Sequence, residues 1–305
     1  MKVVALTGGV GGAKFVRGLH LAGLGGDLTA IVNTGDDFTH LGLHVSPDID
    51  TLLYTLAGLS NRTLGWGREG ESWNFMAALK SVGGPDWFNL GDGDLALHVL
   101  RTHRLTGGET LSSIVSDYAR AWGIEANILP MSDDPVRTVC HTQEGPLAFQ
   151  EYFVREQCRP AMQRIIFEGA GEARATPGVI DAIVSAEAIF VAPSNPYLSV
   201  DPILAVSEIR EALNSASAPV VVISPIVGGK AVKGPTSKLM HELGLEPSND
   251  TIADHYGSLA DAMVHDPSDA APQSLTALAI DTMMRSDADK LRVARAAMDF
   301  AATLR

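Results

Sequence analysis

The sequence predicts an α/β fold built on a doubly wound parallel sheet. Residues 2–6 form a short β-branched run that is typical of a buried parallel strand. A glycine-rich turn follows at residues 8–12, and apolar residues then recur at helical spacing through residues 13–22. A second apolar run, residues 28–32, leads into the polar segment 33–37. Strand, turn, helix and strand in this order open a doubly wound sheet.

The later elements continue this pattern. Residues 189–192 and 220–224 are two further strand candidates, and each is followed by a polar loop that contains proline. Residues 48–125 are mostly helical in pattern, which predicts a helical insert or cap within one domain that spans residues 1–305. The pattern of residues 281–304 predicts a helix at the C-terminal end of the fold. Ligands bind beyond the carboxyl ends of the strands in open α/β sheets, so the loops after the four strands are the candidate site.

Composition excludes several classes of protein. With 46% hydrophobic and 19% charged residues, the 305-residue chain is not globally disordered. Its net charge of −13 argues against sequence-independent binding to nucleic acid or to an anionic membrane. The first apolar run stops at glycines and is interpreted as a strand rather than a signal peptide, and no run reaches membrane-spanning length. We therefore expect a cytoplasmic protein whose two cysteines are reduced.

The glycine-rich turn is the first candidate binding element. Glycine lets the backbone approach a phosphate closely, and the next helix presents its positive end. Gly9, Gly11 and Gly12 do not complete a dinucleotide fingerprint, because Lys14 stands where its third glycine would fall. A Walker A motif is absent as well. The pattern favours phosphate binding, with Lys14 placed to meet the phosphate. The alternative is that the glycines only form a tight turn and that Lys14 is solvated.

Acidic residues follow the second strand. Asp36 and Asp37 come directly after Asn33, and Asp48 and Asp50 form a second pair shortly afterwards. Carboxylates suit a hard divalent cation such as magnesium, which pairs with diphosphates. A single aspartate is more often a helix cap or a turn former. Two pairs after a candidate phosphate loop favour a metal site instead.

Four later segments carry weaker signals. Asp92 is a candidate cap for a helix that would place His98 and Arg101 on one face. Ser194 and Asn195 offer donors suited to a base, a ribose or a phosphate. One further segment contains Asp133 and Asp134, and another contains Gly229 and Lys230. The simplest interpretation of each is an ordinary turn or loop, and the alternative is a loop that binds a ligand.

Nine sequence blocks together resemble one enzyme family. In chain order the blocks are GGVGGAK (8–14), NTGDD (33–37), SPDIDTLLYTL (46–56), WF-x-LGD-x-DLA (87–96), ILPMSDDPV (128–136), FQEYFV (149–154), APSNP (192–196), SPIVGGK (224–230) and GPTSKLM (234–240). The ordered set covers nearly the whole chain. It resembles the CofD (FbiA) family, the 2-phospho-L-lactate transferases of deazaflavin coenzyme F-420 biosynthesis.

The resemblance implies a fold and a reaction. The fold is a Rossmann-like three-layer α/β/α arrangement with a mainly parallel sheet and a helical insert. The reaction moves a phosphorylated three-carbon acid from a guanosine diphosphate donor to a hydroxyl of the deazaflavin Fo, and GMP leaves. The acid is phospholactate, phosphoenolpyruvate or phosphoglycerate in different lineages. Mg²⁺ is the expected cation, and a homodimer is the expected assembly.

The resemblance also implies site residues. Asp50 matches an aspartate associated with Fo, and Asp48 is a second catalytic candidate. The family's arginine at a second Fo position is replaced by Gly93, so that Arg101 or another cation is the candidate substitute. The metal candidates are Asp36, Asp37 and Asp48. The candidates for contact with the donor or the acceptor are Gly9, Gly11, Gly12, Lys14, Asn33, Asp50, Asp92, Ser194, Asn195, Gly229 and Lys230.

Two other functions remain open from the sequence. One is an enzyme of the same fold that uses another nucleotide donor or acceptor, which Gly93 favours. The other is a non-catalytic nucleotide-binding regulator. The SPDID and WF-x-LGD blocks favour the enzyme over the regulator.

Overall fold

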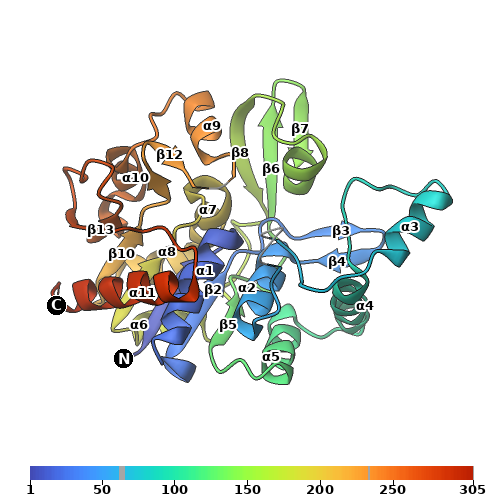
Figure 1. The fold of residues 1–305 in the computed structure, drawn as a ribbon, viewed down its shortest axis with the longest axis horizontal. Coiled ribbons are helices and arrows are strands. Elements are labelled where there is room, and N and C mark those ends of the chain that lie inside the picture. The colour runs from blue at the N-terminus through green and yellow to red at the C-terminus, as the bar shows by residue number, and fades with distance from the viewer. Residues whose placement is uncertain (62–65, 233, 305) are drawn as a thin grey trace.

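A parallel sheet forms the centre of the computed structural model, which describes residues 1–61, 66–232 and 234–304 (Figure 1). Within these residues the sheet has seven strands, and every neighbouring pair is parallel. Across the sheet the strands are β14 (Thr276–Ala279), β13 (Ala262–His265), β10 (Val220–Ile223), β9 (Ala188–Val191), β1 (Val3–Thr7), β2 (Leu28–Val32) and β5 (Asn127–Pro130). The chain thus winds outward from β1 in one direction and then from β9 in the other, which is the doubly wound order.

Both faces of the sheet are covered, which explains the continuous apolar strands. In β1, Val4 and Leu6 belong to one buried cluster, and Val3 and Ala5 belong to the other. Alternate residues point to opposite faces of a strand, so a strand between two helical layers must be apolar throughout. All five β1 residues are buried. The predicted three-layer α/β/α fold is confirmed.

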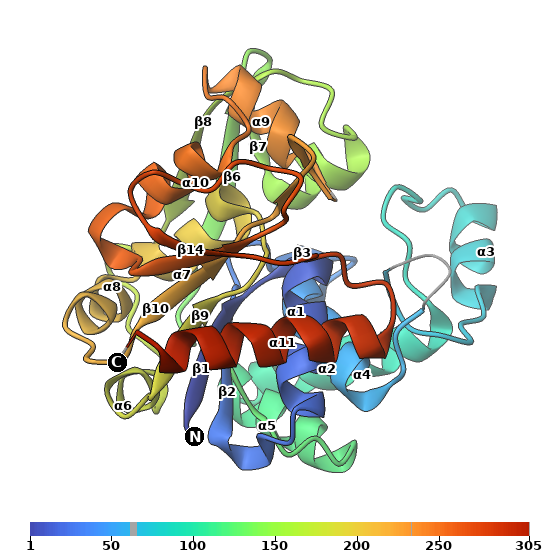
Figure 2. The ribbon, with the colours of Figure 1, turned by 60° about the vertical axis from the view of Figure 1, so that its left-hand side comes forward.

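Helices from distant parts of the chain make up the two outer layers (Figure 2). One layer consists of α1 (Gly9–Leu21), α2 (Pro47–Ala57), α5 (Leu111–Ala121) and α11 (Asp287–Ala302). The other consists of α6 (Val179–Val184), α7 (Asp201–Ala205), α8 (Ser207–Asn214) and α10 (Asn249–Tyr256). In the described part of the chain, no helix has the length and apolar character needed to cross a bilayer.

The helices of residues 48–125 divide between two places. Helices α2 and α5 pack on the sheet through buried side chains such as Leu53 and Ile114. In Figure 1, α3 (Asn74–Ser81) and α4 (Asp92–Thr106) extend away from the sheet beside a small hairpin. The hairpin strands are β3 (Phe38–His40) and β4 (Leu43–Val45).

Smaller elements lie around the sheet. An antiparallel sheet has β6 (Arg137–Thr142) between β7 (Gly145–Ala148) and β8 (Met162–Glu168). A hairpin joins β11 (Ile226–Val227) to β12 (Lys230–Ala231), and α9 (Thr236–Glu242) follows. Short helical turns occupy Gly25–Asp27, Glu151–Arg155, Pro196–Val200 and Gly257–Leu259.

The first helix begins earlier than the sequence predicted. Helix α1 starts at Gly9, so most of the expected loop over residues 8–12 is its first turn. The glycines allow this turn to lie against its neighbours. A Cβ atom on Gly12 would stand 2.5 Å from Ser194 Oγ, and one on Gly11 would overlap the Pro193 carbonyl oxygen. Two of the glycines therefore serve close packing, which is the alternative to a role in phosphate binding.

We predict that Gly18→Ala destabilises the protein. A Cβ atom at Gly18 would stand 2.7 Å from the Lys290 carbonyl carbon, so α1 and α11 would have to separate. We expect the free energy of unfolding, measured in urea, to fall by about 1–2 kcal/mol. This is the net loss, because the higher helix propensity of alanine offsets part of the cost of the clash. The control is Gly26→Ala, whose Cβ would meet only an ordinary contact at 3.8 Å. Equal stabilities of the two variants would contradict this packing argument.

Candidate active site

The loops after β1 and β9 meet at the point where the winding direction reverses. Ser194, after β9, donates its hydroxyl to the Gly8 carbonyl at 2.8 Å and accepts from the Gly8 amide at 3.3 Å. In doubly wound sheets this reversal opens the crevice in which ligands bind. The predicted candidates after β1 and β9 therefore lie together.

Asp48 connects this junction to the end of β2. Its carboxylate accepts from the Gly9 amide at 2.6 Å and from Asn33 Nδ2 at 3.0 Å. The same Asn33 amide group donates to Asp36 at 3.1 Å. A Cβ atom on Gly8 would stand 2.5 Å from the Asp48 carboxylate, so glycine is required here. The structure thus brings Gly9, Asn33, Asp36 and Asp48 together.

The carboxylates of Asp36 and Asp48 are both buried at this junction. Burial raises the pKa of Asp36 well above its ordinary value, and the neighbouring Asp48 and Asp37 raise it further. Burial also raises the pKa of Asp48 to about 6, although the Asn33 and Gly9 hydrogen bonds oppose the shift. Within the described residues, neither Asp36 nor Asp48 pairs with Lys or Arg. Bringing a cation close would relieve this unfavourable burial of charge.

Asp37 is held differently. Its Oδ2 atom accepts from Ser46 at 2.7 Å and lies 3.2 Å from His44 Nε2. Its Oδ1 atom is buried and has no hydrogen-bond partner among the described residues. That oxygen is available to a ligand.

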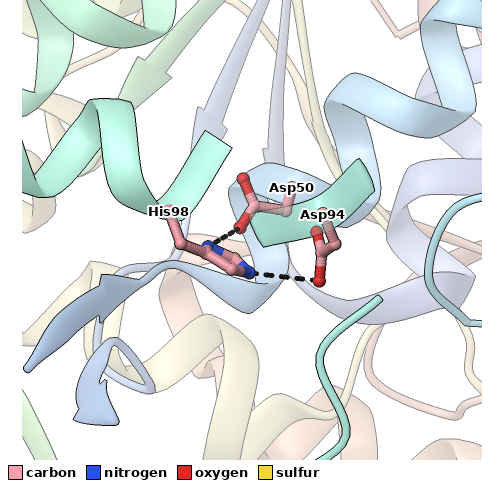
Figure 3. A group of neighbouring side chains, drawn as sticks. All are labelled: Asp50, Asp94 and His98. Carbon is pink, nitrogen blue, oxygen red and sulfur yellow. Dashed lines mark ion pairs between the residues drawn. The ribbon is translucent and has the colours of Figure 1, made fainter. Parts of the chain in front are cut away.

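Asp50 belongs to a second network, which α2 shares with α4. The Arg101 guanidinium is fully buried and donates to both Asp50 oxygens, through Nη1 at 3.1 Å and through Nη2. His98 lies 3.7 Å from Asp50 and 3.1 Å from Asp94, as Figure 3 shows. The Tyr54 hydroxyl donates to the other Asp94 oxygen. The prediction that His98 and Arg101 share one helix face is confirmed.

The geometry distinguishes the two groups of acids as metal sites. Among the described residues, Asp50, Asp94 and His98 offer three ligand atoms within 4.8 Å of one another. Arg101 already neutralises Asp50, however, which leaves little need for a further cation there. Among the residues that the structure describes, the Asp36–Asp48 group has no such counter-charge. It is the better candidate for a cation, although in the described chain its acids do not bring three ligand atoms within 4.8 Å of one another.

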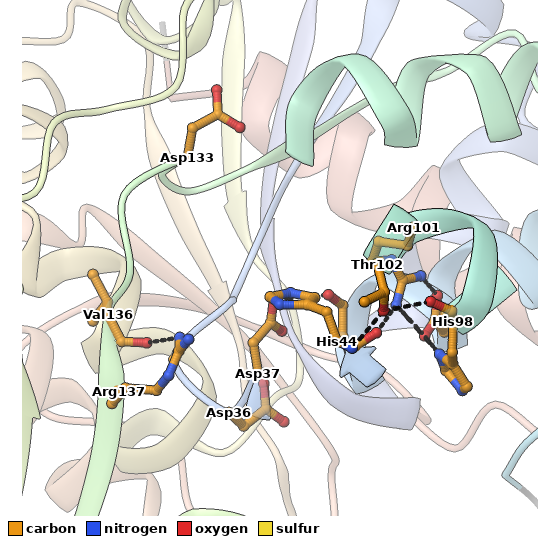
Figure 4. A network of polar contacts seen from close by, with 12 residues as sticks. Asp36, Asp37, His44, His98, Arg101, Thr102, Asp133, Val136 and Arg137 are labelled. Carbon is orange, nitrogen blue, oxygen red and sulfur yellow. Dashed lines mark hydrogen bonds and ion pairs between the residues drawn. The ribbon is translucent and has the colours of Figure 1, made fainter. Parts of the chain in front are cut away.

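A pocket of about 360 Å³ adjoins the acids that follow β2. Gly35, Asp36, Asp37 and Phe38 form one wall of it. The other walls come from β6, β7 and β8, the antiparallel sheet. Figure 4 shows Arg137 on one side of the Asp36–Asp37 turn and the Arg101 network on the other. A larger open groove of about 800 Å³ lies apart, between α6 and α8.

Several predicted site residues have local structural partners. Asp92 does not cap its own helix, whose N-cap is Gly91. Its carboxylate instead accepts from the Asn74 and Phe75 amides at the start of α3, at 3.1 and 3.0 Å. The Gly229 amide donates to Asp269 at 2.6 Å.

The remaining predicted residues differ in their surroundings. Lys230 is exposed on the β11–β12 hairpin, and Lys14 is half-buried on α1. Asn195 caps a helical turn through its Oδ1 atom, while its buried Nδ2 atom has no partner among the described residues. Asp133 accepts from the Ser112 amide at 2.8 Å and Asp134 from the Arg174 amide at 2.9 Å, so both acids bind distant segments of the chain.

Sequence reasoning missed Tyr54, Asp94 and Arg137, in addition to Arg68 near Gly93. Tyr54 and Asp94 complete the Asp50 network. Helical spacing was the signal for both, because Tyr54 lies four residues after Asp50 and Asp94 lies four residues before His98. Arg137 had no comparable signal, because only tertiary structure brings β6 to the end of β2.

Gly93 stands where the resemblance to the family implied an arginine, and the guanidinium of Arg68 lies next to it. A Cβ atom on Gly93 would overlap Arg68 Nη1 and lie 2.9 Å from Glu71. The Gly93 amide donates to Glu71 at 2.6 Å, and Arg68 lies 3.8 Å from the same carboxylate. Arg68, which sequence reasoning did not single out, thus brings an arginine side chain to this position.

Named relatives match the chain over most of its length. The phosphoenolpyruvate transferase of Kitasatospora aureofaciens is 44% identical, over 88% of this chain and 86% of its own. The phosphoenolpyruvate transferase of Streptomyces griseus is 42% identical over 100% of both chains. The 2-phospho-L-lactate transferase of Methanopyrus kandleri is 38% identical, over 97% and 96%.

Structural likeness and a family comparison agree with these relatives. A crystal structure of a UPF0052-family protein from Bacillus halodurans superposes with a TM-score of 0.64 over 97% of this chain and 98% of that one. At 17% identity, that likeness shows the fold alone. The sequence model of the 2-phospho-L-lactate transferase CofD matches residues 3–302. The chain therefore belongs to the CofD family of transferases.

Proposed function

We propose that this enzyme transfers a phosphorylated three-carbon acid from a guanosine diphosphate donor to a hydroxyl of the deazaflavin Fo and releases GMP. One observation supports the donor side above all. Asp36 and Asp48 are buried next to the first amide of α1, and in the described part of the chain neither has a basic partner. A cation-bound diphosphate would supply the charge that these acids lack and the acceptor oxygens that helix amides bind.

We propose phosphoenolpyruvate as the three-carbon acid. The relatives named phosphoenolpyruvate transferase include one that is 44% identical to this chain, whereas the Methanopyrus kandleri relative named 2-phospho-L-lactate transferase is 38% identical. A homodimer and a cytoplasmic location remain predictions from the sequence.

The acids after β2 fit Mg²⁺ by their chemistry. Asp36 and Asp48 offer oxygen ligands, and the free Oδ1 atom of Asp37 is a third candidate. When bound, the ion would neutralise the charge that develops on the phosphoryl oxygens. Asn33 positions the two acids by donating to both of them, and Gly9 fixes Asp48 against the start of α1.

Asp50 is proposed to orient the acceptor hydroxyl. Both Asp50 oxygens accept hydrogen bonds from Arg101, which fixes the carboxylate and stabilises its ionised form. Burial raises the pKa of Asp50, and Arg101 opposes that rise. An anion held in this way is better suited to positioning a hydroxyl than to removing its proton. Arg68, over Gly93, is the proposed cation for the second acceptor contact.

A product assay tests the proposed reaction. The enzyme is incubated with Fo, Mg²⁺ and guanosine diphosphate donors of each three-carbon acid, and GMP and the deazaflavin product are identified by mass. We expect turnover with the phosphoenolpyruvyl donor, loss of turnover in excess EDTA, and recovery on adding Mg²⁺. The absence of GMP release with every donor would reject the function, and full turnover in EDTA would reject the metal.

A pair of substitutions separates the role of Asp50 from its effect on stability. Asp50→Asn leaves the buried Arg101 charge without a partner, and we expect it to lower the free energy of unfolding by about 3–5 kcal/mol. Asp50→Asn combined with Arg101→Met removes both charges and should recover most of that loss. Both variants should lose most transfer activity. A stable double variant with wild-type activity would show that Asp50 has no role in the reaction.

The raised pKa values predict an unusual pH dependence without metal. The folded state binds protons on Asp36 and Asp48 more tightly than the unfolded state does, so these groups make stability fall as pH rises. For Asp48 the fall lies between the unfolded pKa of about 4 and the folded pKa of about 6. Asp36→Asn removes one of these charges and keeps an acceptor for Asn33.

We therefore expect Asp36→Asn to be more stable than the wild type at pH 8 in EDTA, with a smaller difference at pH 5. Urea unfolding at the two pH values measures both differences. A variant that is less stable than the wild type at pH 8 would show that the Asp36 charge is compensated in the folded state.

A further inference from the structure

The groove of about 800 Å³ is formed by α6, α8, the loop after β5 and the segment that precedes α6. Helices α6 and α8 are neighbours in one outer layer of the fold (Figure 2). The volume of the groove falls within the range of small-molecule sites. Gly9, Asn33 and Asp48 do not line it, so the proposed reaction gives this groove no role.

Carboxylates dominate the charge of the groove. The acids that line it are Asp133, Asp134, Asp181, Glu208 and Glu211. Among the described lining residues, Arg174 is the only base. Its Nε atom lies 3.5 Å from Glu208, but the Arg174 side chain is 82% exposed, and an ion pair in such a position contributes little. The groove therefore attracts cationic ligands.

Two of these acids are fixed in place, and two others are available. Asp134 accepts a hydrogen bond from the Arg174 amide at 2.9 Å, and Glu208 accepts one from the Ala175 amide at 2.8 Å. Both carboxylates are thus held before a ligand arrives, which lowers the entropic cost of binding. Asp181 and Glu211 are exposed, and their carboxylates have no partner within the described residues.

Apolar side chains form a stripe beside the acids. Ile180 and Val184 lie one turn apart on α6 and both line the groove. Val184 is 64% exposed, which is unusual for a branched apolar side chain. Opposite this stripe, Glu208 and Glu211 lie one turn apart on α8. Apolar surface along one helix thus faces negative charge along the other.

Thr176 gives an independent indication of a ligand. It lines the groove, its side chain is only 2% exposed, and its hydroxyl oxygen has no hydrogen-bond partner among the described residues. A buried polar atom without a partner is costly. A ligand with N–H donors would satisfy this oxygen.

The groove therefore fits a ligand with several positive charges, N–H donors and methylene groups between them. A bare metal ion does not fit, because in the described chain these acids do not bring three ligand atoms within 4.8 Å of one another and an ion has no use for the apolar stripe. A peptide backbone would place amides and carbonyls against Ile180 and Val184, which offer them no partner. We propose that this groove binds a linear polyamine, with its ammonium groups at Asp181, Glu208 and Glu211 and its methylene groups on Ile180 and Val184.

Calorimetric titration of the full chain with spermidine tests the proposal. The double variant Asp181→Asn with Glu211→Gln removes two charges from the groove and breaks no hydrogen bond of the described structure. We expect it to lower the affinity for spermidine about 10-fold, because each lost carboxylate removes one ion pair with the ligand.

The matched control is the double variant Asp299→Asn with Glu246→Gln. Both residues are exposed and lie outside the groove, and the change in net charge is the same. This control should bind spermidine as the wild type does. Thermal melts establish that every variant is folded. Equal weakening by the two double variants would show that spermidine responds only to net charge, and the proposal would be wrong.

A second comparison isolates the apolar stripe. Val184→Thr keeps the shape of the side chain and adds a hydroxyl, so we expect it to lower the affinity for spermidine about 2- to 5-fold. Hexaamminecobalt(III) carries the same charge as spermidine and has no methylene groups. It should bind more weakly than spermidine and should not respond to Val184→Thr.

Three outcomes would overturn the polyamine assignment. The first is a wild type that does not bind spermidine, and the second is equal affinity for spermidine and hexaamminecobalt(III). The third is tighter binding of a Lys-Ala-Lys-Ala-Lys peptide than of spermidine, which would assign the groove to a basic protein segment instead. None of these results bears on the proposed transfer reaction, which the release of GMP tests separately.

Discussion

The hydrogen bond from the Gly9 amide to Asp48 determines how the site is built. It joins the start of α1 to the start of α2, and through Asn33 it reaches the end of β2. The bond is possible only because Gly8 lacks a side chain that would collide with the carboxylate. The first amide of α1 is thereby bound to the protein's own acid. In the proposed reaction, a donor diphosphate would use the remaining amides of that turn, with a cation between it and the acids.

Two aspartates only two residues apart on α2 have opposite electrostatic surroundings. Asp48 meets an amide, an asparagine and other acids, whereas Asp50 meets the buried Arg101 guanidinium. Their side chains point in different directions because successive helix positions lie about 100° apart. One short helix therefore contributes to two adjacent environments, one that needs a cation and one that already contains a positive charge. This division agrees with separate places for the donor and the acceptor in the proposed reaction.

The sequence predicted the fold well because its signals were local. The apolar runs that became β1, β2, β9 and β10 stand out without tertiary information, and residues 28–32 match β2 at both ends. Strands β5, β13 and β14 were not predicted, because short apolar runs do not distinguish strands from helices. The start of α1 was placed too late, since a glycine run indicates a loop unless one knows that Pro193 and Ser194 pack against it.

The site was only partly predictable, for a related reason. Residues that follow strands could be listed, and Asn33, Asp36, Asp48 and Ser194 do meet at the junction. Partners from distant segments could not be found in this way. Arg137 reaches the site from β6, and the packing of Arg68 over Gly93 depends on how a loop folds back on α4.

The pairing of β1 has a consequence for the synthesis of the protein. On one side β1 pairs with β2, close by in the chain, but on the other Val3 pairs with Ala188. A growing chain can assemble the first half of the sheet while the other edge of β1 still has no partner. The crevice becomes complete only when β9 has left the ribosome, so for much of translation the nascent chain exposes an apolar strand edge that chaperones would have to shield.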